Sequence, residues 1–196
     1  VKIAIFCNIY VNLLQNKFIM KKKTIAIDMD GVLADIEVQL IEHYNKAHGT
    51  TLSKESIQGL AEDDAFDRPL LRSVLNADNF FRTLPVMDDA VESLLRLQEN
   101  FEIFIVSAAT EFPVSLAEKV DWLGEHFPFI KWENIILCGS KRIINTDFMI
   151  DDHSKNLDYC MGKPIMFTAS HNINQTHHLR VNNWKEAVEV LEKTLN

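Results

Sequence analysis

The sequence predicts an α/β protein in which a parallel sheet is covered by helices and a small helical cap is inserted after the first strand. From Thr24 onward, short apolar runs rich in β-branched residues alternate with amphipathic helical stretches, as in a parallel sheet packed between helices. About seventy residues separate the first apolar run from the second, more than a crossover connection needs. The 196 residues are 47% hydrophobic, which is enough for the core of one domain, or of one domain with a small insert.

The strands are predicted where short apolar runs are bounded by polar residues. Because parallel strands all point the same way, their carboxyl ends are expected to meet at one edge of the sheet. The five predicted strands are Thr24–Met29, Glu102–Ser107, Asn134–Cys138, Phe148–Asp151 and Pro164–Phe167.

The helices are predicted from apolar residues that recur with a period of 3.6. Two helices, near residues 36–47 and 88–98, are expected to cover the sheet. Another is predicted around Pro113, which suits the first turn of a helix. Its buried side is expected to carry Leu116, Val120 and Leu123. The last helix is predicted to bury Trp184, Ala187, Val188, Leu191 and Leu195.

The long interval after the first strand is interpreted as a cap. Residues 20–48 and 88–196 are assigned to the core domain, and residues 49–87 to a helical cap. The cap is expected over the carboxyl ends of the strands, where open α/β sheets bind their ligands. A surface loop without function is the alternative, but long structureless loops are rare in compact domains.

The first 19 residues are interpreted as an upstream extension before a start at Met20. They contain two lysines and no acidic residue, and the basic run Lys21–Lys23 follows. A signal peptide is the alternative, but Asn8 and Asn12 interrupt the apolar stretch and no small-x-small cleavage site follows. The stretch is also too short to span a bilayer.

Charge and cysteine content restrict the class of partner and the compartment. The formal net charge of -8 disfavours a nucleic acid polymer, because binding its backbone requires clustered lysine and arginine. An anionic substrate must then be held by a metal ion or by a few placed cations. Cys7, Cys138 and Cys160 are widely spaced and form no CxxC pair. A cytoplasmic protein without a membrane partner is therefore expected.

The strongest chemical signal is the run from Thr24 to Asp35, in which four apolar or β-branched residues lead to Asp28-Met29-Asp30-Gly31. Alternation along an extended strand turns Asp28 and Asp30 to the same side. Carboxylates at the end of a strand are suited to bind a hard cation through oxygen. A solvated acidic pair is the alternative, and the apolar residues on both sides of the pair disfavour it.

Further polar residues follow the other predicted strands. Ser107 ends the second strand, Lys141 follows the third, and Asp151 and Asp152 end the fourth. Taken singly, these residues suit a helix cap, a loop lysine and a turn. At consecutive strand ends, however, they would bring a hydroxyl, a cation and a third acidic position to one edge of the sheet.

These residues resemble the four motifs of the haloacid dehalogenase superfamily, and within it the chain resembles the 5'(3')-deoxyribonucleotidase family. The closer likeness rests on AspMetAspGlyValLeuAlaAsp at 28–35, AsnPhePhe at 79–81, IleAspAsp at 150–152 and PheThrAla with HisAsn at 167–172. It covers essentially everything after Met20. The resemblance implies a Rossmann-like core with a helical cap, and a phosphatase that acts on nucleoside monophosphates.

The resemblance also implies a mechanism. Asp28 would be the nucleophile that forms an aspartyl-phosphate, and Asp30 the acid and then the base. Mg²⁺ would be held by Asp28, by the backbone carbonyl of Asp30 and by Asp151. Asp152 would not bind the ion directly but would orient the groups that do. The phosphoryl group would be held by Gly31, Ser107, Ala108 and Lys141.

The chain departs from the family pattern where the substrate is chosen. Ile36, Leu60, Ala61 and Leu75 stand where related enzymes carry aromatic residues, and these four are predicted to line the substrate pocket. Stacking is worth about 1–3 kcal/mol per base, so weak discrimination among bases is expected. Glu111 also stands where the family pattern has a lysine.

Other conspicuous residues are given structural roles. Phe80 and Phe81 are expected in the core of the cap, with a platform for a base as the alternative, and Trp184 is expected on the core side of its helix. His171, His177 and His178 are expected in a surface loop, because they lack the spacing of a zinc site. Arg68, Arg72 and Arg82 are expected to be solvated, although each is within reach of a substrate from the cap.

Several alternatives stay open at this point. A phosphatase of another small phosphometabolite, such as a sugar phosphate, fits the same residues, and so does a phosphomutase. A dehalogenase would not need Asp30, and a phospho-receiver carries its lysine after the acids, whereas Lys141 precedes Asp151. A silent phosphate-binding relative is disfavoured because every expected catalytic position is present. A homodimer is compatible with the sequence.

Overall fold

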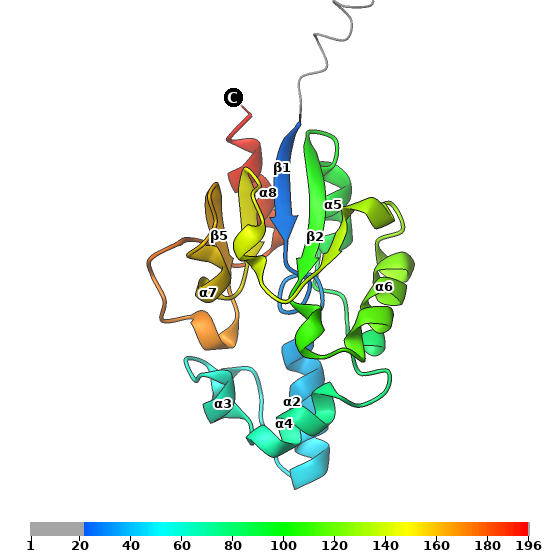
Figure 1. The fold of residues 1–196 in the computed structure, drawn as a ribbon. Helices are drawn as coiled ribbons and strands as arrows, with labels where there is room; N and C mark the ends of the chain where they lie inside the picture. The colour runs from blue at the N-terminus through cyan, green and yellow to red at the C-terminus, as the bar shows by residue number, and fades with distance from the viewer. Residues whose placement is uncertain (1–21, 196) are drawn as a thin grey trace, which may run out of the picture.

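The computed structural model describes residues 22–195, and the predicted extension at residues 1–19 lies outside this range. Its centre is one parallel sheet of six strands in the order β3-β2-β1-β4-β5-β6 (Figure 1). The strands are β1 (Lys23–Ile27), β2 (Phe101–Ser107), β3 (Ile135–Leu137), β4 (Phe148–Asp151), β5 (Lys163–Phe167) and β6 (Leu179–Val181). All five predicted strands are present, within a few residues of their expected bounds.

The first strand lies in the middle of the sheet because its apolar residues are covered on both faces. Ile25, Ala26 and Ile27 are each at most 1% exposed. The strand pairs in parallel with β2 and β4, so Ile27 lies beside Ile105 on one side and Ile150 on the other. This register brings the ends of β1, β2 and β4 to the same edge of the sheet.

The sixth strand was not predicted. β6 has three residues and follows a polar stretch, and its Leu179 is 54% exposed. Such a short edge strand has little apolar periodicity of its own. It forms because it pairs with β5, placing Phe167 beside Val181.

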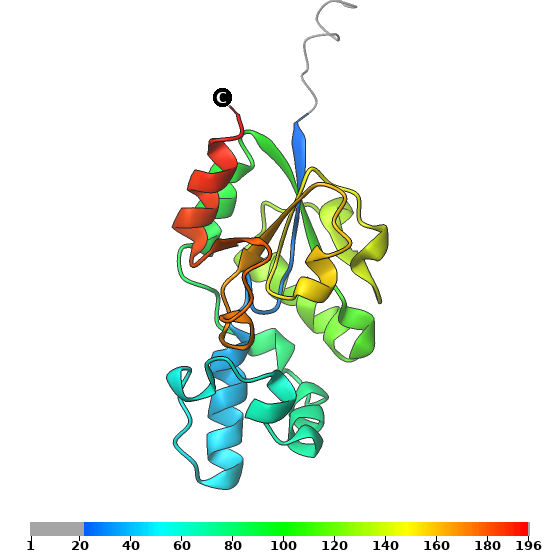
Figure 2. The same ribbon diagram turned by 90° about the vertical axis from the view of Figure 1, so that its left-hand side faces the viewer.

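Helices cover both faces of the sheet, as expected. Helices α5 (Ala90–Leu97) and α8 (Trp184–Glu192) pack against each other on one face, and α6 (Ser115–His126) and α7 (Ser154–Leu157) lie on the other (Figure 2). The predicted burial of Trp184 is confirmed, and its indole N–H donates to the Val32 carbonyl at 2.9 Å. Leu195 was predicted to be buried, but it lies beyond the end of α8 and is 43% exposed.

The buried face of α6 differs from the prediction. The helix begins at Ser115, two residues after Pro113, and Val120 is 45% exposed. Lys119 is buried in place of Val120, together with Ser115 and Trp122. The periodic pattern of aliphatic residues was misleading because the contacts of Lys119 compensate the burial of its charge.

A second body lies below the carboxyl edge of the sheet. It contains α2 (Ile36–His48), α3 (Glu62–Ala65) and α4 (Arg68–Leu75) (Figures 1 and 2). α2 was expected to cover the sheet, but it lies with α3 and α4 and packs against α4. Its buried Gln39 donates to the Phe80 carbonyl at 2.7 Å, which joins α2 to the segment returning to the core.

Short 3₁₀ helices complete the connections. Phe80 and Phe81 flank the start of one of them and are each 2% exposed, which confirms their predicted place in the core. Within residues 22–195, no helix has the length and apolar character needed to cross a membrane. The 3₁₀ helices are η1 (Glu55–Ile57), η2 (Phe81–Thr83), η3 (Ala109–Glu111), η4 (Trp132–Asn134), η5 (Lys141–Ile143) and η6 (Ser170–Asn172).

Candidate active site

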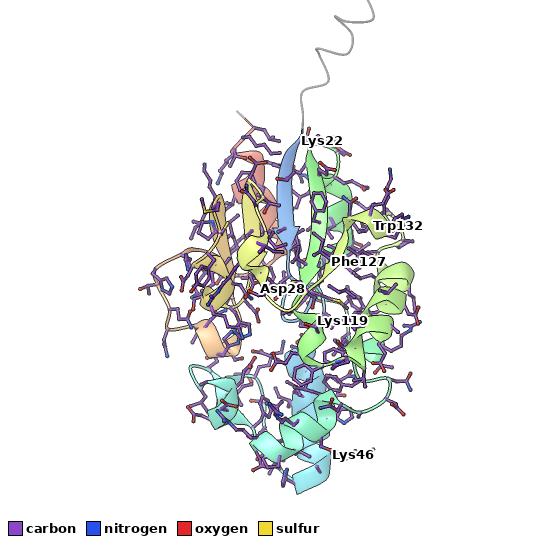
Figure 3. All side chains as sticks on the ribbon, viewed as in Figure 1. Lys22, Asp28, Lys46, Lys119, Phe127 and Trp132 are labelled. Carbon is purple, nitrogen blue, oxygen red and sulfur yellow. The ribbon has the colours of Figure 1, made fainter. Side chains whose placement is uncertain are left out.

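A cavity of about 430 Å³ lies between the carboxyl edge of the sheet and the lower helices. Asp28 and Lys119 lie at this junction (Figure 3). From the core, the cavity is lined by Asp28, Asp30, Ser107, Lys141 and Asp152. From the lower body it is lined by α2 and α4 side chains, so a ligand bound there would touch both bodies.

Asp28 and Lys141 line the cavity and form a buried charged cluster with Asp151, which is not itself among the lining residues. Asp28 follows β1, Lys141 begins η5, and Asp151 ends β4, so the sheet brings together three residues distant in sequence. The Lys141 Nζ lies 2.6 Å from Asp28 Oδ1 and 2.6 Å from Asp151 Oδ2. All three residues are at most 7% exposed. The expected juxtaposition of Asp28, Lys141 and Asp151 is therefore present.

Burial and crowding determine the protonation of this cluster. Burial, aided by the charge of Asp151, raises the pKa of Asp28 to about 8. Burial also raises the pKa of Asp152 to about 7. Burial by itself would lower the pKa of Lys141, but the carboxylates of Asp28 and Asp151 outweigh it and raise that pKa. More positive charge is needed here for Asp28 and Asp152 both to be ionised at neutral pH.

The carboxylates also have the arrangement of a divalent cation site. One oxygen each from Asp28, Asp151 and Asp152 lies within 4.8 Å of the others. Among the described residues, Asp152 Oδ1 is buried without a hydrogen-bond partner. Buried carboxylate oxygens that lack donors are suited to bind a hard cation, directly or through water. This residue set fits Mg²⁺.

Hydrogen bonds from neighbouring residues hold the Asp151 carboxylate in place. Its Oδ1 accepts from the His153 backbone N–H at 2.9 Å and from Asn156 Nδ2 at 3.0 Å. These bonds fix the carboxylate at the end of β4 before any ligand arrives. Asn156 was not singled out from the sequence, since an asparagine in a short helix carries no distinctive pattern.

Gly31 shapes the turn after β1, and its predicted contact with phosphate stays a prediction. Its backbone N–H donates to the Ala34 carbonyl at 2.8 Å. The φ of Gly31 is +75°, and a Cβ added there would lie 2.3 Å from Asp152 Oδ2. Gly31 therefore allows the turn after β1 to pack directly against Asp152.

Asp30 and Ser107 are joined by a residue that sequence reasoning missed. The Lys119 Nζ donates to Asp30 Oδ2 and, at 2.9 Å, to Ser107 Oγ. Lys119 is 2% exposed. The available signal was the stripe Ser115, Lys119, Trp122 and Leu123, which has helical spacing and places the lysine on the buried face.

Only part of the predicted substrate pocket lies at the cavity. Ile36 and Leu75 line it, whereas Leu60 and Ala61 are not among its lining residues, and Leu60 is 41% exposed. Leu60 and Ala61 lie between η1 and α3, so of the four predicted positions only Ile36 and Leu75 can contact a ligand in this cavity.

Other lining residues come from both bodies. Ala108 lies in the cavity wall as predicted, and Glu111 lies there too. Phe81 and Phe112 are also among the lining residues, so aromatic side chains lie at the cavity although the four expected positions are aliphatic. Arg68 and Arg72 line the cavity from α4. Arg82 is instead paired with Glu125.

His171 is not a surface loop residue, contrary to expectation. Its side chain is 11% exposed, and its Nε2 lies 3.1 Å from the Asp152 carbonyl oxygen. It stacks on His153, which was not singled out from the sequence, at 4.4 Å between ring centroids. His153 in turn lies 3.6 Å from Glu62 of α3 and so connects the lower body to the core. The side chain of His177 is 53% exposed, as expected, whereas that of His178 is only 10% exposed.

An aspartate pair after the central strand, a lysine after β3 and an acidic pair after β4 define, on this fold, a hydrolase of the haloacid dehalogenase superfamily. Solved structures of this superfamily share the fold. A haloacid dehalogenase-like hydrolase from Streptococcus pneumoniae aligns with 87% of this chain and 98% of its own, with a TM-score of 0.58 and 12% identity. A Bacillus subtilis hydrolase described as bound to magnesium aligns with 88% and 99%, with a TM-score of 0.56 and 13% identity.

The chain belongs to the 5'(3')-deoxyribonucleotidase family and is a phosphoric monoester hydrolase. The family described as "5' nucleotidase, deoxy (Pyrimidine), cytosolic type C protein" matches residues 22–195. A Staphylococcus aureus protein described as a "Putative 5'(3')-deoxyribonucleotidase" is 39% identical over 173 residues, which cover 85% of this chain and 94% of that protein. The 5'(3')-deoxyribonucleotidase of Bacillus subtilis is 37% identical over 174 residues, covering 84% and 96%.

Proposed function

We propose that the protein is a magnesium-dependent phosphatase of nucleoside monophosphates and acts through an aspartyl-phosphate on Asp28. The observation that supports this most directly is the buried contact of Lys141 with Asp28 and Asp151 beside the cavity. The contact with Lys141 therefore fixes the Asp28 carboxylate in the wall of a cavity that can hold a small ligand. The names of the family relatives supply the substrate class.

The two carboxylate oxygens of Asp28 differ in their contacts, because Oδ1 accepts from two donors of the protein. The Lys141 Nζ lies 2.6 Å from Oδ1, and the Met29 backbone N–H donates to the same oxygen at 2.7 Å. We assign Oδ2 to the attack on phosphorus. The two contacts orient the carboxylate, so little rotation is needed for the reaction.

Asp28, Asp151 and the backbone carbonyl of Asp30 would hold Mg²⁺, supported by Asp152. The cation supplies positive charge against the phosphoryl oxygens when bound. Lys141 remains against Asp28 and Asp151, and Ser107 offers its hydroxyl from the end of β2. Asp30 would give a proton to the leaving oxygen and take one back from the water that hydrolyses the aspartyl-phosphate.

A substrate panel tests the function. The protein should hydrolyse deoxyribonucleoside 5'- and 3'-monophosphates with Mg²⁺ and lose this activity in EDTA, and added Mg²⁺ should restore it. Ribonucleotides and sugar phosphates belong in the panel, because the wall formed by Ile36 and Leu75 offers little stacking. Release of phosphate from none of these monoesters, or full activity after exhaustive chelation, would refute the proposal.

A further inference from the structure

We infer that Lys119 is a positioning residue that fixes which oxygen of Asp30 carries the transferable proton and turns the Ser107 hydroxyl toward the phosphoryl group. The inference rests on the proposed phosphatase function and extends it to a residue outside the superfamily motifs. Lys119 comes from α6, which no part of the predicted catalytic set included.

The ammonium group of Lys119 is buried and tightly surrounded. The residue is 2% exposed, and its Nζ lies 4.6 Å from the centre of the Phe81 ring. A lysine is almost never fully buried unless it is paired, so its partners determine its role. Those partners are Asp30 Oδ2 and Ser107 Oγ, two groups that the proposed reaction uses.

The backbone that carries Lys119 is also fixed. The neighbouring Glu118 carboxylate accepts from the backbone N–H groups of Asn79, Phe81 and Arg82, at 2.7, 3.0 and 3.2 Å. This carboxylate ties α6 to the segment that returns from the lower body. Lys119 and the Phe81 ring beneath it are therefore held in one rigid arrangement at the cavity wall.

An ammonium group can only donate hydrogen bonds, which determines the protons around it. Asp30 Oδ2 and Ser107 Oγ must both accept from Lys119. The Ser107 hydroxyl hydrogen is then directed to another acceptor. Because Ser107 lines the cavity, we assign this acceptor to an oxygen of a phosphoryl group bound there. When Asp30 is neutral, its proton is therefore assigned to Oδ1. This oxygen is buried and has no hydrogen-bond partner among the described residues, so the leaving oxygen has to come into direct contact with Asp30 to receive the proton.

This assignment gives a balanced pair of proton transfers. As the bond from Asp28 Oδ2 to phosphorus forms and the bond to the leaving oxygen breaks, the proton on Asp30 Oδ1 moves to the leaving oxygen. Water then attacks phosphorus and gives one proton to Oδ1, the bond to Asp28 breaks, and phosphate leaves. The Lys119 ammonium group stays hydrogen-bonded to Asp30 Oδ2 in both steps. The Asp30 carboxyl group therefore does not rotate and exchange the positions of Oδ1 and Oδ2.

The test uses substrates that differ in their need for an acid. A nucleoside leaving group needs protonation, whereas para-nitrophenolate leaves with little help. Lys119→Met keeps the length and the apolar stem but removes the ammonium group. Because kcat/KM reports only the formation of the aspartyl-phosphate, where the leaving groups differ, we expect kcat/KM for a deoxynucleoside 5'-monophosphate to fall about 100-fold or more and kcat/KM for para-nitrophenyl phosphate to fall less than about tenfold.

Lys46→Met is the matched control. It removes the same charge from an exposed position on α2, far from the cavity (Figure 3). Both substrates should be hydrolysed by this variant as by the wild type. Thermal melting of all variants separates loss of fold from loss of turnover.

Rescue supplies the second measurement. In Lys119→Ala, added propylammonium should restore nucleotide hydrolysis in a saturable way without raising the melting temperature. Nucleotide turnover of Lys119→Met within about threefold of wild type would overturn the inference. So would equal losses on both substrates together with no rescue, since that pattern indicates a purely structural lysine. A wild type inactive on both substrates would contradict the proposed function itself, and the inference with it.

Discussion

At the scale of single residues, the site depends on how closely the backbone approaches the acidic cluster. Gly31 has a φ of +75°, and a Cβ there would lie 2.3 Å from Asp152 Oδ2. Gly49 also has a positive φ, +64°, but a Cβ there would meet nothing within 4 Å. A side chain at either glycine would strain the backbone, because both have a positive φ. Only at Gly31 would the added Cβ also clash with Asp152.

Alanine at these two glycines should separate strain from clash. Gly49→Ala should destabilise the fold by about 1–2 kcal/mol and leave turnover unchanged. Gly31→Ala should cost more, about 2–4 kcal/mol, and should also reduce turnover and Mg²⁺ affinity because Asp152 is displaced. Denaturant unfolding and steady-state kinetics measure both effects. Equal destabilisation by the two variants would show that the contact with Asp152 has no energetic weight.

Asp28→Asn tests the nucleophile directly. The amide is nearly isosteric with the carboxylate but cannot attack phosphorus as an anion. We expect kcat to fall by about four orders of magnitude or more, with the circular dichroism spectrum unchanged. Measurable turnover near the wild-type rate would exclude Asp28 as the nucleophile. Asp158→Asn, at an exposed aspartate outside the cavity, is the control and should behave as wild type.

At the scale of elements, the contact between α3 and the core is electrostatic. The His153 Nε2 lies 3.6 Å from Glu62 Oε1. Burial by itself would lower the pKa of His153, but the charges of Asp152 and Glu62 outweigh it and raise that pKa to about 9. The close contact with the His153 ring lowers the pKa of Glu62.

The pH range of this contact follows from the two shifts. The raised pKa of His153 gives stability that is complete below its unfolded value of 6.5 and is lost as pH rises through about 9. The lowered pKa of Glu62 gives stability that is present above its unfolded value of 4.5 and is lost as pH falls through its folded value. The contact is therefore strongest in the mildly acidic to neutral range.

An NMR titration of the His153 ring checks this contact. In the metal-free protein the ring should titrate well above 6.5, and Glu62→Gln should move its pKa down. Asp158→Asn removes a carboxylate that contacts His178 instead, so it should leave the His153 titration unchanged. A ring that titrates at or below its usual value in the wild type would show that α3 is not held by this pair.

At the scale of the whole molecule, the acidic cluster couples folding to metal and pH. Burial raises the folded pKa of Asp28 to about 8 and that of Asp152 to about 7, from ordinary values of 3.8. The folded state therefore binds more protons than the unfolded state over this range. The corresponding stability is complete below about pH 4 and is lost as pH rises through 7 to 8.

Melting curves measure this coupling. The chelated protein should melt at a lower temperature at pH 9 than at pH 6. Added Mg²⁺ should raise the melting temperature more at pH 9, because ionised carboxylates bind it and binding stabilises only the folded state. Asp28→Asn should reduce both effects. A melting temperature of the chelated wild type that does not fall between pH 6 and 9 would contradict the assigned direction.

The sequence by itself determined the order of the main elements and the residues that meet beside the cavity. Parallel strands end at one edge, so Asp28, Asp30, Ser107, Asp151 and the loop carrying Lys141 had to converge once the strands were located. This information is local: each residue is marked by the apolar run that precedes it. The strand pattern also excluded a fold without a central sheet.

Only the tertiary structure decided the contacts that depend on which surfaces pack together. β6 exists because β5 offers an edge, and α2 joins α4 instead of the sheet. Periodicity predicts that a helix has a buried face, but it does not say what that face meets. Lys119 is buried because Asp30, Ser107 and the Phe81 ring meet its ammonium group, and these partners lie up to 89 residues away in the chain.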